Sequence, residues 1–146
     1  MPFRFALASI LNLRRSQERQ RLLSLQQAVA ILSGVQSQLE HLETYLAKSA
    51  VEDAHRLTAG LTGADLHFAE SVRARFESRR AHLVAQICEK ELLRDTALAA
   101  YRKASADRQI LEALETKQRS AFLQEQARRE QQHIDASYLF HRWKRG

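Results

Sequence analysis

The chain has 146 residues, with 23 Lys and Arg against 17 Asp and Glu, so its formal net charge is +6. A single cysteine, Cys88, excludes an internal disulfide, and no apolar run approaches the roughly 20 residues that span a bilayer, so we expect a soluble cytoplasmic protein. One Pro and four Gly among many Ala, Leu, Glu, Gln and Arg disfavour a sheet and predict an all-α protein.

The excess positive charge lies at the two ends of the sequence. Residues 1–21 hold five basic residues against one acidic residue, a net of +4, and residues 128–146 hold five against two, a net of +3. The residues between them have a net charge of −1. If the chain folds back once on itself, its termini meet and form one basic tip. Such a tip suits insertion into a partner of complementary charge.

The first predicted helix covers about residues 5–58. Leucines recur there at strict seven-residue intervals, the spacing of a coiled-coil seam: Leu25, Leu32, Leu39 and Leu46. The preceding segment, residues 14–21, is polar on every face. A helix of that kind should be solvated or contact another molecule.

A turn is predicted at about residues 59–63, where Gly60 and Gly63 lie close together. Thr62 followed three residues later by Asp65 resembles a capping box, so the second helix should start at about residue 64. No helix breaker follows, and this helix should reach about residue 142. The sequence therefore predicts one domain, residues 1–146, built as a long antiparallel two-helix coiled coil, or helical hairpin.

The second predicted helix extends past the first. In an antiparallel pairing centred near residue 61, residue 5 lies opposite about residue 117. Beyond that point the helix carries large apolar side chains without an expected partner in the chain: Phe122, Leu123, Ile134, Tyr138, Leu139, Phe140 and Trp143. We expect them to contact another protein, and a frayed helix end or a homodimer are the alternatives.

The sequence lacks the side-chain patterns of catalytic and metal sites. None of the six histidines has a second His, Cys or carboxylate at a spacing that makes a convincing zinc face, and there is no glycine-rich phosphate loop or G-x-S-x-G motif. We expect no enzymatic activity, no metal and no cofactor. Nucleic-acid binding is disfavoured as well, because acidic residues alternate with basic ones over most of the chain.

The two ends of the sequence carry motifs in a specific order. Residues 3–18 contain F-x-F-x-L, an apolar pair, Leu-Arg and then a Glu. Toward the other end, Leu-Glu-x-Leu at residues 111–114 precedes Arg-Arg-Glu-Gln-Gln-His-Ile-Asp at residues 128–135, and Ala136 follows. These motifs resemble those of FliJ, a family of the flagellar type III export system, whose distal motif is R-x-E-Q-K-x-I-D-E. The resemblance covers nearly the whole chain.

This resemblance implies a hairpin similar to the central stalk, or gamma subunit, of rotary ATPases. It also implies that the paired termini enter the pore of a hexameric export ATPase and promote its assembly and activity. Further implied partners are the cytosolic domain of an FlhA-type export gate protein and export chaperones. We expect the chain to meet the membrane only through that apparatus, and our hypothesis is that six arginines guide insertion: Arg14, Arg15, Arg19, Arg21, Arg128 and Arg129.

The family's gate-binding patch matches five positions toward the turn: Gln38, Leu42, Tyr45, Phe68 and Val72. Tyr45 and Phe68 are the preferred contacts, because aromatic side chains bury a large area with few rotatable bonds. Leu42 and Val72 also suit the seam, and Ser49 replaces an aromatic residue of the family patch. Two alternative functions are the stalk of a virulence-type injectisome and a basic coiled-coil adaptor that binds nucleic acid or a membrane surface.

Overall fold

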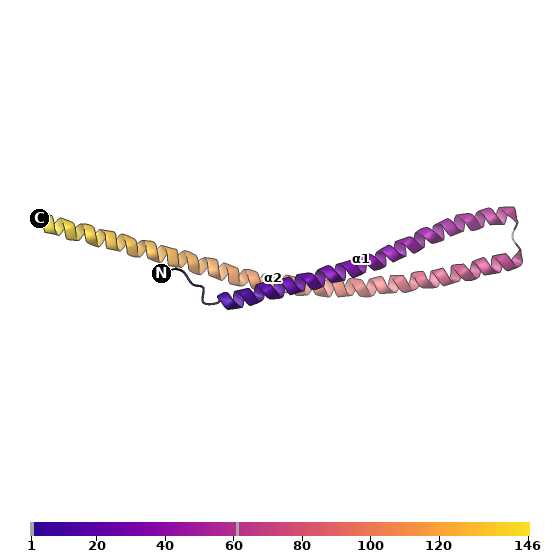
Figure 1. Cartoon of the computed structure of the whole chain (residues 1–146), viewed down its shortest axis with the longest axis horizontal. Coiled ribbons are helices and arrows are strands. Elements are labelled where there is room, and N and C mark those ends of the chain that lie inside the picture. The colour runs from indigo at the N-terminus through magenta and orange to yellow at the C-terminus, as the bar shows by residue number, and fades with distance from the viewer. Residues whose placement is uncertain (1, 61) are drawn as a thin grey trace. The chain divides into compact units, whose positions relative to one another are not determined.

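The computed structural model describes residues 2–60 and 62–146, and these contain two helices and no strand (Figure 1). Helix α1 runs over Ala8–Ala59 and helix α2 over Gly63–Arg145. The two helices pack against each other as an antiparallel hairpin, which confirms the predicted all-α fold class. Met1 and Leu61, the latter in the middle of the predicted turn, lie outside the described residues.

The ends of the helices at the turn are set by local chemistry. The backbone N–H of Asp65 donates to Thr62 Oγ1 at 3.2 Å, and the N–H of Leu66 donates to the Thr62 carbonyl at 3.1 Å. Thr62 is therefore the N-cap that the sequence predicts for the second helix. Directly after α1, Gly60 has a φ of +90°, a conformation that favours glycine and stops the helix.

The contacts of the chain fall into two units. The terminal unit comprises Met1–Gln20 and Arg102–Gly146, and the turn unit comprises Arg21–Tyr101. The terminal unit holds 14 basic and 7 acidic residues, a net charge of +7, whereas the turn unit holds 9 and 10, a net of −1. The division of charge between the two units therefore follows the pattern seen in the sequence. That the whole chain forms a single domain stays a prediction.

The core of the turn unit is a narrow seam between α1 and α2. Leu32 and Leu83 are buried, with 4% and 2% of their surface exposed. The other members of the leucine repeat, Leu25, Leu39 and Leu46, are half-buried. Since a pair of helices shields each seam residue on only one side, most apolar side chains here keep some contact with water.

In the terminal unit, the chain before α1 forms an aromatic strap, residues 2–7, that lies on α2. The Phe3 ring packs on Phe122 with 5.5 Å between ring centroids, and the Arg119 guanidinium lies 5.4 Å from the Phe3 centroid. Phe5 is buried, with 8% of its surface exposed. The expectation that Phe122 lacks a partner is therefore wrong. The sequence pattern indicated a helix from about residue 5, whereas the non-helical strap brings Phe3 to Phe122.

Candidate functional site

Two of the six arginines predicted to guide insertion, Arg14 and Arg15, form ion pairs with α2. Arg15 donates from Nε and Nη2 to Glu112 Oε1, both at 3.3 Å, and Arg14 Nη1 lies 3.6 Å from Asp107 Oδ2. Both side chains keep 41% and 44% of their surface exposed, so this polar segment is solvated here and also pairs with α2 within the chain. Asp107 and Glu112 on α2 lie opposite these two arginines, so this part of the seam is polar.

A charged cluster continues that polar seam. Arg108 on α2 donates to Glu18 on α1 and also, from Nη1, to Glu112 at 2.5 Å. The hydrogen bond with Glu18 is the main reason that the pKa of Arg108 is raised, while burial opposes the shift and the charge of Glu112 adds to it. With Arg15, the cluster contains two cations and two anions. Charge pairs of this kind favour one register between two helices, as polar residues do in coiled coils.

Arg128 and Arg129 share one carboxylate, that of Glu125, on the exposed side of α2. The distances are 2.9 Å from Arg128 Nη2 and 3.3 Å from Arg129 Nε to Glu125 Oε1. The hydrogen bond from Arg128 is the largest cause that lowers the pKa of Glu125, and burial opposes it. The same bond raises the pKa of Arg128. One anion faces two cations, so this cluster keeps a positive charge at the surface.

The remaining two of the six arginines, Arg19 and Arg21, are exposed on α1. Neither forms an ion pair with any residue that the structure describes. Arg19 belongs to the terminal unit, and Arg21 is the first residue of the turn unit. They are thus the arginines of the predicted set whose charge is wholly available to another molecule. The sequence did not distinguish them, because charge pairing depends on how the two helices are aligned.

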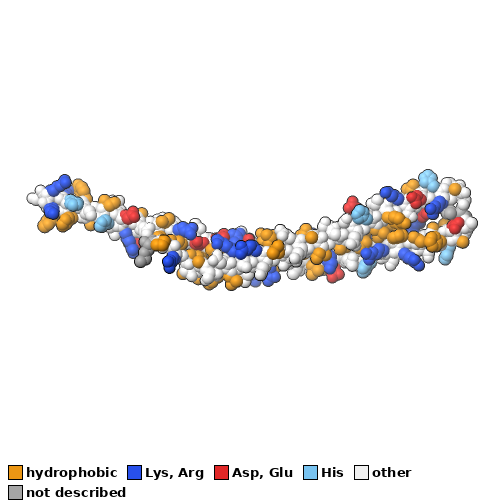
Figure 2. All heavy atoms as spheres, in the orientation of Figure 1, with side chains coloured by type: hydrophobic (Ala, Val, Ile, Leu, Met, Phe, Trp, Pro, Cys, Tyr) orange, Lys and Arg blue, Asp and Glu red, His pale blue; other side chains and the backbone are white. Residues whose placement is uncertain are grey.

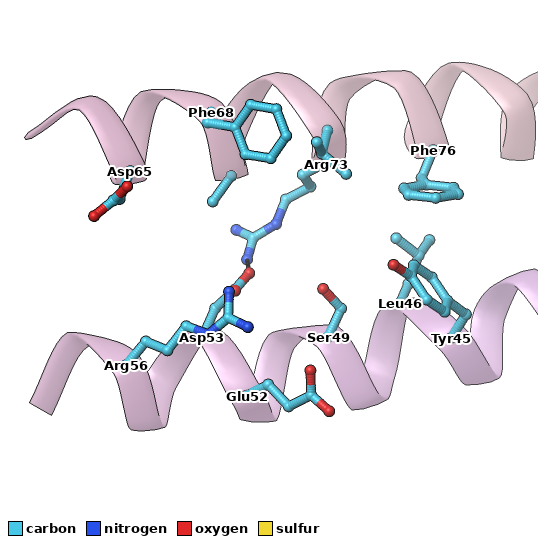
Figure 3. A pocket seen from close by; sticks show the side chains of 12 residues that line it. Tyr45, Leu46, Ser49, Glu52, Asp53, Arg56, Asp65, Phe68, Arg73 and Phe76 are labelled. Atoms are coloured by element: carbon cyan, nitrogen blue, oxygen red, sulfur yellow. Dashed lines mark hydrogen bonds and ion pairs between the residues drawn. The ribbon is translucent and has the colours of Figure 1, made fainter. Parts of the chain in front are cut away.

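The second site is a cleft of about 490 Å³ between α1 and α2 in the turn unit (Figure 3). Three residues of the predicted gate contact, Tyr45, Phe68 and Val72, line it. An ion pair between Arg73 and Asp53, with 3.5 Å between Nη2 and Oδ2, crosses the cleft. Apolar residues make up half of the lining, and charged or polar residues, among them Glu52, Arg56 and Asp65, make up the other half. A mixed lining of this kind suits a partner side chain that has both an apolar and a polar part.

The five predicted gate residues differ in how exposed they are and in whether they pack on a neighbour. Phe68 has 71% of its surface exposed, whereas the Tyr45 ring packs on the Phe76 ring at 4.9 Å between centroids. Gln38 is exposed and Leu42 is half-buried, and neither lines the cleft. Among the three of these residues that line the cleft, Phe68 is therefore the most available for contact. Tyr45 and Phe76 also stabilise the hairpin, so Tyr45 has a structural role beside any binding role.

Among residues 2–60 and 62–146, no group of three or more His, Cys, Asp and Glu side chains could hold a metal ion. Cys88 is exposed and unpaired. Neither described helix contains a stretch long and apolar enough to cross a membrane. What the sites present is surface charge in the terminal unit and a lined cleft in the turn unit.

Comparison with known proteins adds one family. The family model described as "Flagellar FliJ protein" matches residues 3–145. No curated protein and no solved structure matches the chain. The match begins at the aromatic strap, includes both helices and ends at the last residue of α2. The chain therefore belongs to the FliJ family and is a component of the flagellar type III export system.

Proposed function

We propose that the chain is the non-enzymatic stalk of the flagellar export apparatus. Its paired termini insert into the hexameric export ATPase and promote the assembly and activity of that ring. The turn unit contacts the cytosolic domain of an FlhA-type export gate protein, and the chain also escorts export chaperones. In this role it is cytoplasmic and attached peripherally to the inner-membrane apparatus. The match to a flagellar family favours this system over a virulence-type injectisome.

The observation that carries the proposal is the charge of the terminal unit. This unit contains both ends of the chain, and it holds a net charge of +7 against −1 in the turn unit. Exposed charge mainly raises the rate at which two proteins meet in a productive orientation. Arg19 in this unit, and Arg21 just beyond its boundary on α1, have no ion pair in the described chain. This asymmetry suits a unit that enters a partner with its termini first.

The proposal is tested by measuring association with the purified export ATPase. In the variant Arg19→Glu/Arg21→Glu, association should be slower and less dependent on salt, since steering by charge is screened by ions. The control variant, Arg75→Glu/Arg79→Glu, makes the same charge change at two exposed arginines of the turn unit. It should associate like the wild type. If both variants associate alike, the terminal unit does not guide insertion.

The gate contact needs a separate test at the cleft. Phe68→Ala removes the exposed ring without disturbing the packing of Tyr45 on Phe76. We expect weaker binding to the gate protein's cytosolic domain, an unchanged melting temperature and unchanged ATPase binding. Leu57→Ala, also in the turn unit with 57% of its surface exposed, is the matched control. Equal gate binding by Phe68→Ala and the wild type would remove Phe68 from the contact.

A further inference from the structure

The last turns of α2 carry an unusual density of exposed rings and cations. We call residues 134–145 the C-terminal segment. Its large apolar side chains are all exposed, from 56% of the surface for Phe140 to 78% for Trp143. The only ring contact recorded there joins two neighbours within the described segment, Phe140 and His141, at 6.0 Å. The segment thus presents aromatic surface to whatever surrounds it.

Three of the five large apolar residues of the segment share one face, and Ile134 and Tyr138 lie on the opposite side. At 3.6 residues per turn, successive side chains are about 100° apart around a helix. Leu139, Phe140 and Trp143 then fall within an arc of about 100°, and Arg142 and Lys144 lie about 100° to either side of Trp143. Figure 2 shows hydrophobic and basic side chains next to one another at this end of the chain.

The charge of the segment is positive and available. Asp135 is the last acidic side chain of the sequence, and three cations follow it, Arg142, Lys144 and Arg145. All three are exposed, and none forms an ion pair with the residues that the structure describes. An apolar face with long basic side chains at both edges is the pattern of a helix that lies in the interface of an anionic bilayer.

We propose that the C-terminal segment binds the surface of a membrane that contains anionic lipids. Leu139, Phe140 and Trp143 enter the boundary between headgroups and acyl chains, and Arg142 and Lys144 contact the anionic headgroups. This is a direct contact, in addition to any attachment through the export apparatus. It uses none of the six arginines assigned to ATPase insertion. A chain seated in an ATPase ring by its termini would have this face covered, so the contact belongs to the chain outside the ring.

A second copy of the chain explains this face less well. A homodimer through the extension of α2 would need an apolar seam along the exposed helix. Residues 124–133 contain only one apolar residue, Ala127, so such a seam stops between Leu123 and Ile134. Nucleic acid would account for the cations but not for Leu139 beside them, which has 62% of its surface exposed. A bilayer interface accounts for both.

Trp143 makes the proposal directly measurable, because it is the only tryptophan in the chain. The full-length chain is titrated with phosphatidylcholine vesicles, with or without phosphatidylglycerol, and tryptophan emission and vesicle flotation are recorded. Anionic vesicles should shift the emission to the blue and carry the chain upward. Zwitterionic vesicles should do neither, and added salt should weaken the effect.

Two variants separate the apolar and the charged contributions. Leu139→Gln/Phe140→Gln keeps the probe, the cations and good helix propensity, and should abolish the blue shift. Arg142→Gln/Lys144→Gln should weaken binding about fivefold for each cation removed. The control, Leu92→Gln/Leu93→Gln, replaces two adjacent exposed leucines of the turn unit and should bind like the wild type.

Three results would overturn the proposal. The first is the absence of a blue shift with anionic vesicles. The second is vesicle binding that survives Leu139→Gln/Phe140→Gln. The third is a tryptophan shift that needs no lipid: if it follows protein concentration together with dimerisation in the ultracentrifuge, the face belongs to a second copy, and if it follows added duplex DNA, the cations belong to nucleic acid.

Discussion

Truncating Leu83 to alanine should destabilise the turn unit by about 2.4 kcal/mol, since three carbon atoms leave the seam at about 0.8 kcal/mol each. Leu83 is one of the most buried side chains among the described residues, with 2% of its surface exposed. In an enclosed core the residual cavity adds to this loss. Here the seam is open to solvent on both sides, so neighbouring side chains and water reach the space, and the transfer term should dominate.

Leu92 provides the matched control on the same helix and in the same unit. It keeps 69% of its surface exposed, so Leu92→Ala loses only the buried third of the same transfer energy, about 0.7 kcal/mol. Urea denaturation followed by circular dichroism at 222 nm measures both variants. A chain of this length should also melt about 5–10 °C lower for Leu83→Ala. Equal destabilisation of the two variants would refute a hairpin held together by this seam.

Three other predictions address the terminal unit. Phe5→Ala should lower the urea midpoint, with a loss of about 3 kcal/mol in the free energy of unfolding, because its ring is buried. Arg108→Gln should lower that midpoint and leave Glu18 without its α2 partner, whereas Arg102→Gln, an exposed control without an ion pair in the described chain, should not. The pKa of Glu125 is lowered, so its ion pairs stabilise the helix at neutral pH and are lost as the pH falls through that lowered value. In Arg128→Gln, an NMR titration should show that the pKa of Glu125 rises.

The fold could be predicted because its determinants are local or periodic. The seven-residue leucine repeat that contains Leu32 specifies a seam without knowledge of the partner helix. Thr62 caps α2 through a hydrogen bond to Asp65, which is only three residues away in the sequence. Both features depend on neighbours in the sequence, and the structure has both of them.

The aromatic strap and the ion pairs could not be predicted in the same way. Phe3 and Phe122 are far apart in the sequence, and their contact depends on a non-helical start and on the alignment of α1 with α2. The pairing of Arg15 with Glu112 depends on the same alignment. A shift of one helical turn would give each of these side chains a different neighbour. The alignment of α1 with α2 is set by contacts in the folded hairpin, and it cannot be read from composition.

Net charge, in contrast, is independent of register. Every ion pair cancels one cation and one anion, so pairing leaves the net charge of the terminal unit at +7 whichever of its 7 acidic residues meet which cations. The long-range attraction that the sequence predicts therefore survives the intramolecular pairing of Arg14 and Arg15. Pairing decides instead where the uncompensated cations lie. On α1 these cations are Arg19 and, just beyond the boundary of the unit, Arg21, and at the end of α2 they are the cations beside Trp143. Charge reversal at Arg19 and Arg21 therefore tests steering without breaking an ion pair of the seam.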